Sequence, residues 1–152
     1  MDLATPKSIL RRRLLQASGA ALVLLNVRPV AATPENLAAA LKRKFGNRRI
    51  QPGRVKIDIP QIAENGNVVP ITIDVESPMV ADDFVKRIHL FSEHNPLPDI
   101  VEFELGPHNG KARVSTRIRM AKSQFVLAVA ALDDDTLWSA QALIEVTVSG
   151  CG

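Results

Sequence analysis

The alternation of apolar and polar residues is the feature that most constrains the fold of this chain. Apolar side chains recur at every second position in most of its short segments, which is the period of a β-strand with one face in a core. Seven segments are predicted strands: 55–59, 69–75, 85–91, 101–105, 112–120, 125–132 and 138–148. Segment 125–132 is an unbroken apolar run, which favours a central strand covered on both faces. Pro70 lacks an amide donor and predicts a sheet edge or a ladder gap at its position.

The connections between these segments are short and rich in turn residues. Asn65-Gly66 favours a turn with positive φ, Asn95 to Pro98 is a rigid bend, and Asp133-Asp134-Asp135 turns the chain again. This spacing predicts an all-β fold, an immunoglobulin-like antiparallel β-sandwich of about seven strands. The Cys…Trp…Cys signature of antibody domains is absent, so the expected likeness is architectural. Exposed edges of such a sandwich could be covered by a partner subunit.

One short N-terminal helix is expected before the strands. Thr33-Pro34-Glu35 combines an N-cap, a proline at the first helical position and an early acid. Leu37, Leu41 and Phe45 then recur every four residues, and Gly46 is placed to end the helix. The basic residues in its last turn suit the negative end of the helix, and we expect them to form a solvated surface. With 152 residues of which 46% are hydrophobic, helix and strands predict a single domain over 33–148.

The first 32 residues have the organisation of an export signal. The basic cluster at Arg11-Arg12-Arg13 precedes an apolar run that ends near Val27, and small residues at 31–32 suit cleavage. Polar residues interrupt that run, so a permanent membrane anchor is the less favoured alternative. Arg12 and Arg13 resemble a twin-arginine signal, although ordinary secretion is also possible. The leader holds five of the 19 basic residues and one of the 16 acidic ones, so the mature chain has no basic surplus for nucleic acid.

The only cysteine of the chain, Cys151, lies in a four-residue tail with Ser149, Gly150 and Gly152. It has no partner thiol in its own chain, so its chemistry is expected to be intermolecular or covalent with a ligand. A catalytic cysteine has a thiolate stabilised by a basic neighbour, a helix N-terminus or a metal. Cys151 has none of these nearby in sequence, and the terminal carboxylate disfavours a second negative charge beside it. The pattern predicts a covalent handle on a flexible arm, 149–152, rather than a self-contained catalytic nucleophile.

The histidines and the acidic run at 133–135 do not indicate a catalytic or metal-binding site. His89, His94 and His108 have no ligand-like neighbours at short spacing, so structural or surface roles are expected and no metal site is predicted. The acidic run at 133–135 lacks the glycine and the distal glutamate of a calcium loop. We therefore expect no catalytic residue, no metal and no cofactor.

Several blocks of the mature chain resemble one known family. They are the stretch Ile62 to Pro70, then Glu76 to Met79, Asn95-Pro96, Ser115 to Arg119 and the ending Val146 to Gly152. The chain resembles the SoxY family, the sulfur-carrier subunits of bacterial thiosulfate-oxidising (Sox) systems. The family ending is Gly-Gly-Cys-Gly-Gly; here Ser149 replaces the first glycine and the last glycine is absent, which makes the arm stiffer and shorter.

This resemblance implies a function as a periplasmic carrier without turnover of its own. It implies a heterodimer with a SoxZ-like subunit, loading of Cys151 with thiosulfate by a c-type cytochrome, and presentation of the adduct to a hydrolase that releases sulfate. Disulfide-type bonds suit this, because they are stable enough to travel and are cleaved by thiolates. Two other classes stay open from the residues: a secreted adhesion or assembly module with an interchain disulfide, and a thiol peroxidase or sulfurtransferase, which lacks an activating residue near Cys151.

Overall fold

The computed structural model describes residues 34–147, and the described part contains one α-helix and nine strands in two sheets. The elements are α2 (Pro34–Phe45), β1 (Ile50–Pro52), β2 (Val55–Asp58), β3 (Ile62–Ala63), β4 (Val69–Val75), β5 (Val85–Ser92), β6 (Asp99–Glu104), a 3-10 turn η1 (Pro107–Asn109), β7 (Arg113–Ile118), β8 (Gln124–Leu132) and β9 (Leu137–Val146). The leader 1–32, with Arg12 and Arg13, lies outside the described residues. No helix within residues 34–147 is long and apolar enough to cross a membrane.

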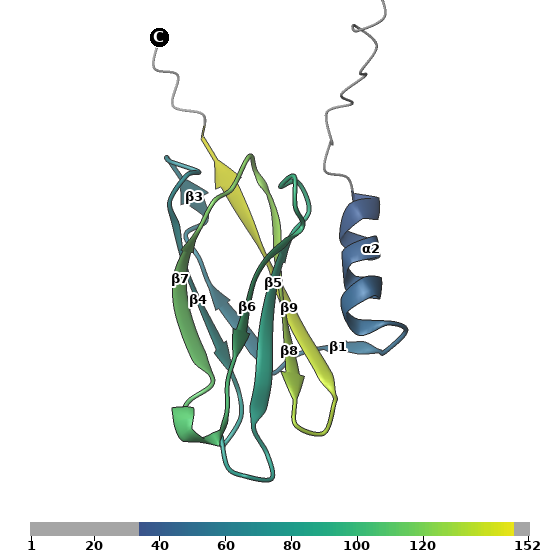
Figure 1. Cartoon of the computed structure of the whole chain (residues 1–152). Helices are drawn as coiled ribbons and strands as arrows, with labels where there is room; N and C mark the ends of the chain where they lie inside the picture. Colours follow the sequence, from purple (N-terminus) through teal and green to yellow (C-terminus); the bar gives the residue numbers. More distant parts are fainter. Residues whose placement is uncertain (1–33, 148–152) are drawn as a thin grey trace, which may run out of the picture. The chain divides into compact units, whose positions relative to one another are not determined.

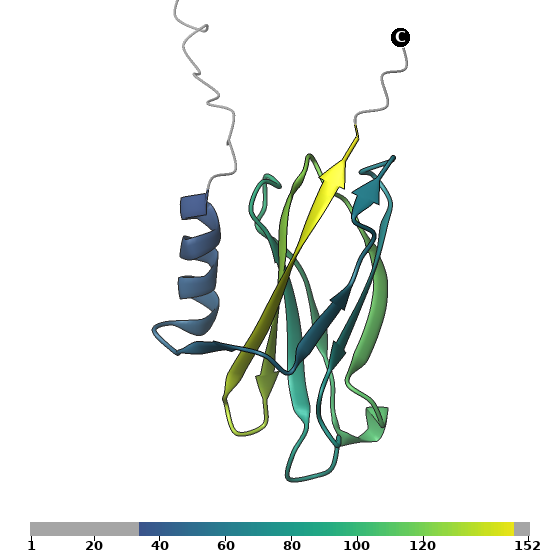
Figure 2. The same cartoon turned by 180° about the vertical axis from the view of Figure 1, so that it is seen from behind.

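The two sheets form the predicted immunoglobulin-like sandwich (Figures 1 and 2). The larger sheet has the order β1-β9-β8-β5-β6, with β3 also paired to β9, and the smaller sheet has the order β2-β4-β7. All seven predicted segments contain a strand. Two further strands, β1 and β3, were not predicted, and both pair with β9 in parallel. The sandwich is therefore not wholly antiparallel, because segments of two or three residues are too short to show a period.

The main hydrophobic core lies between the two sheets. Its fully buried side chains include Ile73 of β4, Ile88 and Leu90 of β5, Val126 of β8 and Ile144 of β9. Ile73 and Ile144 belong to strands that the period-two pattern marked, and Val126 belongs to the unbroken apolar run of segment 125–132. Each buried aliphatic side chain contributes about 1.5–3 kcal/mol. The sandwich is thus held by the residues from which it was predicted.

A second, smaller core lies between α2 and the outer face of the larger sheet. Phe45 and Ala40 of the helix pack there with Phe91, Val129 and Leu137. Figure 2 shows the helix alongside this sheet. The helix ends as predicted: Gly46 has φ +66° and its N–H donates to the Lys42 carbonyl oxygen at 2.9 Å.

The structure tests the predictions made for Pro70 and for segment 125–132. Pro70 is in β4, the middle strand of its sheet, but β2 pairs only with positions 72–75, so Pro70 has a neighbour on the β7 side alone. Of the two predicted alternatives, the sheet edge is confirmed, because β4 has a free edge at Pro70 on the side of β2. β8 is central, between β5 and β9, and helix α2 covers its Val129. Phe125 is the exception to the predicted coverage on both faces, since it is 39% exposed.

Candidate functional site

The candidate site is the end of the sandwich at which β9 finishes. β3, the β5–β6 loop and the β7–β8 loop reach the same end (Figure 1). The predicted carrier residue Cys151 and the arm residues Ser149, Gly150 and Gly152 lie outside the described residues, as does Val148. The structure therefore describes the base from which the arm starts, up to Thr147.

The base of the arm is held on both edges of β9. On one edge, the Glu145 and Thr147 backbone N–H groups donate to the carbonyl oxygens of Gln61 and Ala63, at 2.8 and 3.0 Å. On the other, the Val146 N–H donates to Ser123 Oγ at 2.9 Å. Sequence analysis did not single out Ser123 or Gln61, because their partners are more than 20 positions away. The chain is thus hydrogen-bonded up to Thr147, four residues before Cys151, a reach of roughly 13 to 14 Å.

A polar pair, the partly buried Asn95 and the buried Gln124, joins the loops around this base. Asn95 donates from Nδ2 to the Arg119 carbonyl oxygen at 2.7 Å, and its Oδ1 accepts from the Ala121 N–H at 3.0 Å. Gln124 is 3% exposed; its Nε2 donates to Asn95 Oδ1 at 3.0 Å and its Oε1 accepts from the His94 N–H at 2.7 Å. The predicted bend at Asn95-Pro96 is therefore a tie between two loops, and Gln124, which precedes the apolar run of β8, was missed.

An open groove of about 1100 Å³ lies beside the base of the arm. Its lining includes Asn65 and Asn67 from the β3–β4 loop, Leu97 from the β5–β6 loop, Arg119 and Thr147. Arg119 is the one cation among the lining residues. Arg119 lines this groove, while Arg117 is exposed and pairs in register with Pro70.

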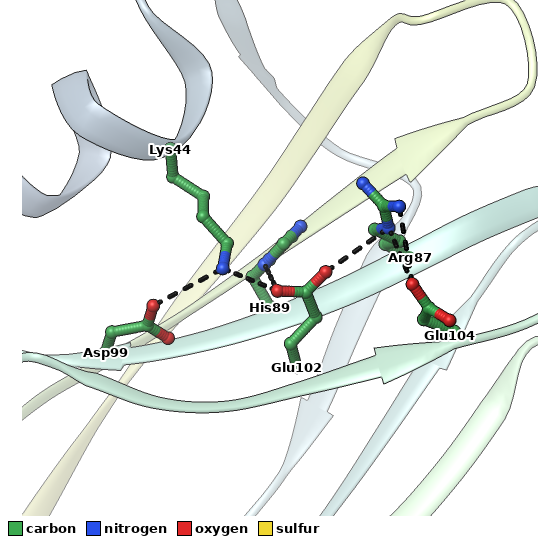
Figure 3. A network of polar contacts seen from close by, with 6 residues as sticks. All are labelled: Lys44, Arg87, His89, Asp99, Glu102 and Glu104. Carbon is green, nitrogen blue, oxygen red and sulfur yellow. Dashed lines mark hydrogen bonds and ion pairs between the residues drawn. The ribbon is translucent and has the colours of Figure 1, made fainter.

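A second polar cluster joins helix α2 to strands β5 and β6 (Figure 3). Lys44 Nζ lies 2.5 Å from Glu102 Oε2 and 3.6 Å from Asp99 Oδ2. Arg87 Nε lies 3.2 Å from Glu102 Oε1, and His89 Nδ1 lies 3.6 Å from Glu102 Oε2. The basic helix end is exposed, as expected, but the fold also brings two carboxylates of β6 beneath the last helical turn, where they pair with Lys44.

The ionisation of this cluster follows from its contacts. The hydrogen bond with Glu102 raises the pKa of Lys44 and lowers the pKa of Glu102. Burial lowers the pKa of His89, against the opposing attraction of Glu102. His89 is 3% exposed, packs edge-on against Phe45 at 5.0 Å between ring centroids, and has no hydrogen-bond partner at Nδ1. Its environment is that of a structural residue, as predicted, and residues 34–147 contain no group of three or more His, Cys, Asp or Glu that could hold a metal.

Comparison with protein families gives one match that spans most of the chain. The family model of the sulfur oxidation protein SoxY matches residues 41–151. The chain belongs to the SoxY family. This membership is that of a sulfur carrier family rather than of a catalytic enzyme, in agreement with the sequence-based expectation. The SoxY match includes the strands, the groove and the base of the arm described above.

Solved structures agree with this assignment. The structure of the sulfur carrier protein SoxY from Chlorobium limicola f thiosulfatophilum is 32% identical, with a TM-score of 0.63, and the match covers 75% of this chain and 98% of that one. A superoxide reductase (neelaredoxin) from Ignicoccus hospitalis is 18% identical with a TM-score of 0.56, covering 78% of this chain and 96% of that one. A putative superoxide reductase from Thermotoga maritima is 17% identical with a TM-score of 0.55, covering 70% and 97%. The reductases share the fold alone. Comparison with curated protein sequences gives no significant match.

Proposed function

We propose that this protein is a periplasmic sulfur carrier that holds thiosulfate-derived intermediates on Cys151 and presents them to the enzymes of a Sox system. Membership of the SoxY family is the observation that carries the proposal. Export by a twin-arginine signal containing Arg12 and Arg13, and a heterodimer with a SoxZ-like subunit, belong to the same proposal. The carrier needs no cofactor of its own, since the sulfur chemistry is supplied by its partners.

The proposed cycle has two balanced steps at Cys151. In the first, the thiol and thiosulfate form an S–S bond, and two electrons pass to a c-type cytochrome while the thiol proton goes to water. In the second, a hydrolase adds water across the terminal sulfur–sulfonate bond, which releases sulfate and leaves a persulfide on the cysteine. The Cys151 sulfur remains bonded to the chain throughout, so the protein acts as a mount rather than a catalyst.

The rigid base of the arm supports this role. Thr147 is hydrogen-bonded to Ala63, and Val146 to Ser123, so the thiol is carried a short distance beyond a fixed point. Gly150 and Gly152 have no Cβ atom and allow the chain around the thiol to enter a narrow channel. Ser149, in place of a family glycine, removes some of this freedom at the start of the arm.

Intact mass spectrometry tests the proposal. Incubation with thiosulfate and the oxidising cytochrome should add one thiosulfate-derived unit to the wild-type protein and none to a Cys151→Ser variant. An adduct on Cys151→Ser would contradict the assignment of the attachment site. A stable disulfide-linked dimer from the native compartment, without any sulfur adduct, would instead favour the assembly module, and turnover by the purified chain alone would favour an enzyme.

A further inference from the structure

Exposed apolar side chains gather at the end of the sandwich where the arm begins. In the described range 34–147, six large apolar residues are strongly exposed, by 39% to 76%: Ile62, Val68, Val80, Leu97, Phe125 and Leu143. Five of them lie on β3, just before β4, at the start of β8, near the end of β9 and in the β5–β6 loop, all at the end where β9 finishes (Figure 1). Val80 alone lies at the opposite end, in the β4–β5 connection.

Three of the five are neighbours on the outer face of the larger sheet. Phe125 and Leu143 are directly opposite each other in the β8–β9 register. Ile62 pairs in register with Glu145, two residues beyond Leu143 on the same face. Directly paired side chains on one sheet face have Cβ atoms about 5 Å apart, and diagonal neighbours about 7–8 Å. Helix α2 covers this face further along, over Val129, but leaves this end exposed.

The other two lie beside the groove at the base of the arm. Leu97 is part of the groove lining, and Val68 follows Asn67, which also lines it. With the outer-face residues they form the apolar collar, defined here as Ile62, Val68, Leu97, Phe125 and Leu143. On an ordinary monomer the largest contiguous apolar patch is roughly 300–600 Å² and is often functional.

The length of the arm limits how a partner can reach the thiol. Thr147 is hydrogen-bonded to the sandwich, and only four residues separate its position from that of Cys151, a span of roughly 13 to 14 Å. An enzyme that reacts with this thiol below its own surface must therefore bring its channel mouth against the end of the sandwich. Because the arm is this short, the channel mouth then contacts the exposed collar.

We propose that the apolar collar is the docking surface for an apolar rim around the channel of the enzyme that loads Cys151. The inference rests on the proposed function and adds to it the surface by which the partner binds. Five side chains suit a small interface of the transient class, below about 1,200 Å², rather than an obligate subunit interface of 2,000 Å² or more. A small interface also suits a carrier that must leave one enzyme for the next, because most affinity differences are expressed in the dissociation rate.

Loading kinetics of the full-length protein test the collar. The probe is thiosulfate with the c-type cytochrome of a Sox system, and the adduct is measured by intact mass. We expect Phe125→Ser/Leu143→Ser, and separately Leu97→Ser, to lower kcat/KM about tenfold or more through KM, with kcat little changed. Val80→Ser is the matched control: it removes an equally exposed apolar side chain at the far end and should load like the wild type.

Two further readouts separate docking from other effects. Reaction of Cys151 with a small aromatic disulfide reagent should be equal in all variants, because it needs no docking, and their thermal midpoints should match that of Val80→Ser. A peptide of sequence Val-Ser-Gly-Cys-Gly should be loaded less efficiently than the whole protein.

The docking proposal would be overturned, and the carrier function left intact, if the collar variants loaded like Val80→Ser or if the free peptide loaded as well as the protein. Collar variants whose only defect is loss of a permanent subunit would overturn it as well. Failure of the wild type to load at all would overturn both proposals.

Discussion

The Met120 backbone N–H donates to the Gly66 carbonyl oxygen at 2.7 Å, and this bond ties the β3–β4 loop to the residues that follow β7. A Cβ atom added to Gly66 would collide with the Met120 carbonyl oxygen and lie 2.9 Å from Val146 Cγ1. The glycine of the Asn65-Gly66 turn is therefore required by close packing of backbone against backbone. Both of its neighbours, Met120 and Val146, also line the groove beside the arm.

Gly66→Ala should destabilise the protein by about 1–3 kcal/mol, because the added methyl group must push a backbone oxygen aside. Denaturant unfolding measures this difference. Gly106→Ala is the matched control, since a Cβ there would meet nothing within 4 Å and the residue has φ −153°. Equal stability of the two variants would contradict the close-packing argument.

Asn95→Ala should cost about 1–3 kcal/mol, because it leaves the buried Gln124 Nε2 with one partner fewer and frees the Ala121 N–H and the Arg119 carbonyl oxygen. Amide hydrogen exchange at Ala121 should accelerate more than at residues of β4. Asn109→Ala removes a single exposed bond, from the Gly106 N–H, and serves as the control. Exchange at Ala121 that stays at the wild-type rate would show that Asn95 does not tie the loops.

The Lys44–Glu102 ion pair should stabilise the attachment of α2 to the sheet. A double-mutant cycle with Lys44→Met and Glu102→Gln is expected to give a coupling energy of about 0.5–1 kcal/mol, since both side chains are partly exposed. The same cycle with Lys42→Met in place of Lys44→Met should give a value near zero. High salt should reduce the first coupling, and a coupling that salt leaves unchanged would argue against an electrostatic origin.

His89 should make stability depend on pH. Burial lowers the pKa of His89 in the folded protein, so the unfolded chain binds more protons below the ordinary value of 6.5, and stability falls as pH drops from there towards the folded-state pKa. The groups that face His89 are Glu102, Lys44, Asp99 and Arg87. His89→Phe should pack with Phe45 and Phe91 and lose this dependence.

The measurement is the thermal midpoint of both proteins from pH 7.5 downwards. Above pH 6.5, His89 should not change the thermal midpoint of the wild type as pH varies. Below pH 6.5, the thermal midpoint of the wild type should fall increasingly below that of His89→Phe. The lowered pKa of Glu102 adds a loss of stability below its ordinary value of 4.5 in both proteins. Parallel curves across pH 5–7 would show that His89 does not carry the dependence.

Much of the fold follows from local patterns, and the exceptions share one cause. Gly46 ends α2 and Pro70 marks a local sheet edge because each effect depends on the residue's own backbone chemistry. β1 and β3 went unpredicted because what makes them strands is the facing backbone of β9, far away in sequence. The ion pairs of Lys44 went unpredicted for the same reason, since Glu102 and Asp99 come beneath it only when β6 is in place.

The sequence by itself determined the strand pattern, the helix with its ends and the position of a lone thiol in a short glycine-containing tail. These are properties of neighbouring residues, and period, capping and chain flexibility act over a few positions. Only the tertiary structure decided that Thr147 is hydrogen-bonded to Ala63 while its neighbour Val146 is hydrogen-bonded to Ser123, and that Asn95 and Gln124 join two loops there. It also decided that five exposed apolar side chains lie at the end of the sandwich where the arm begins. These residues come from segments that lie dozens of positions apart, and only the packing of the two sheets brings them to one end of the molecule.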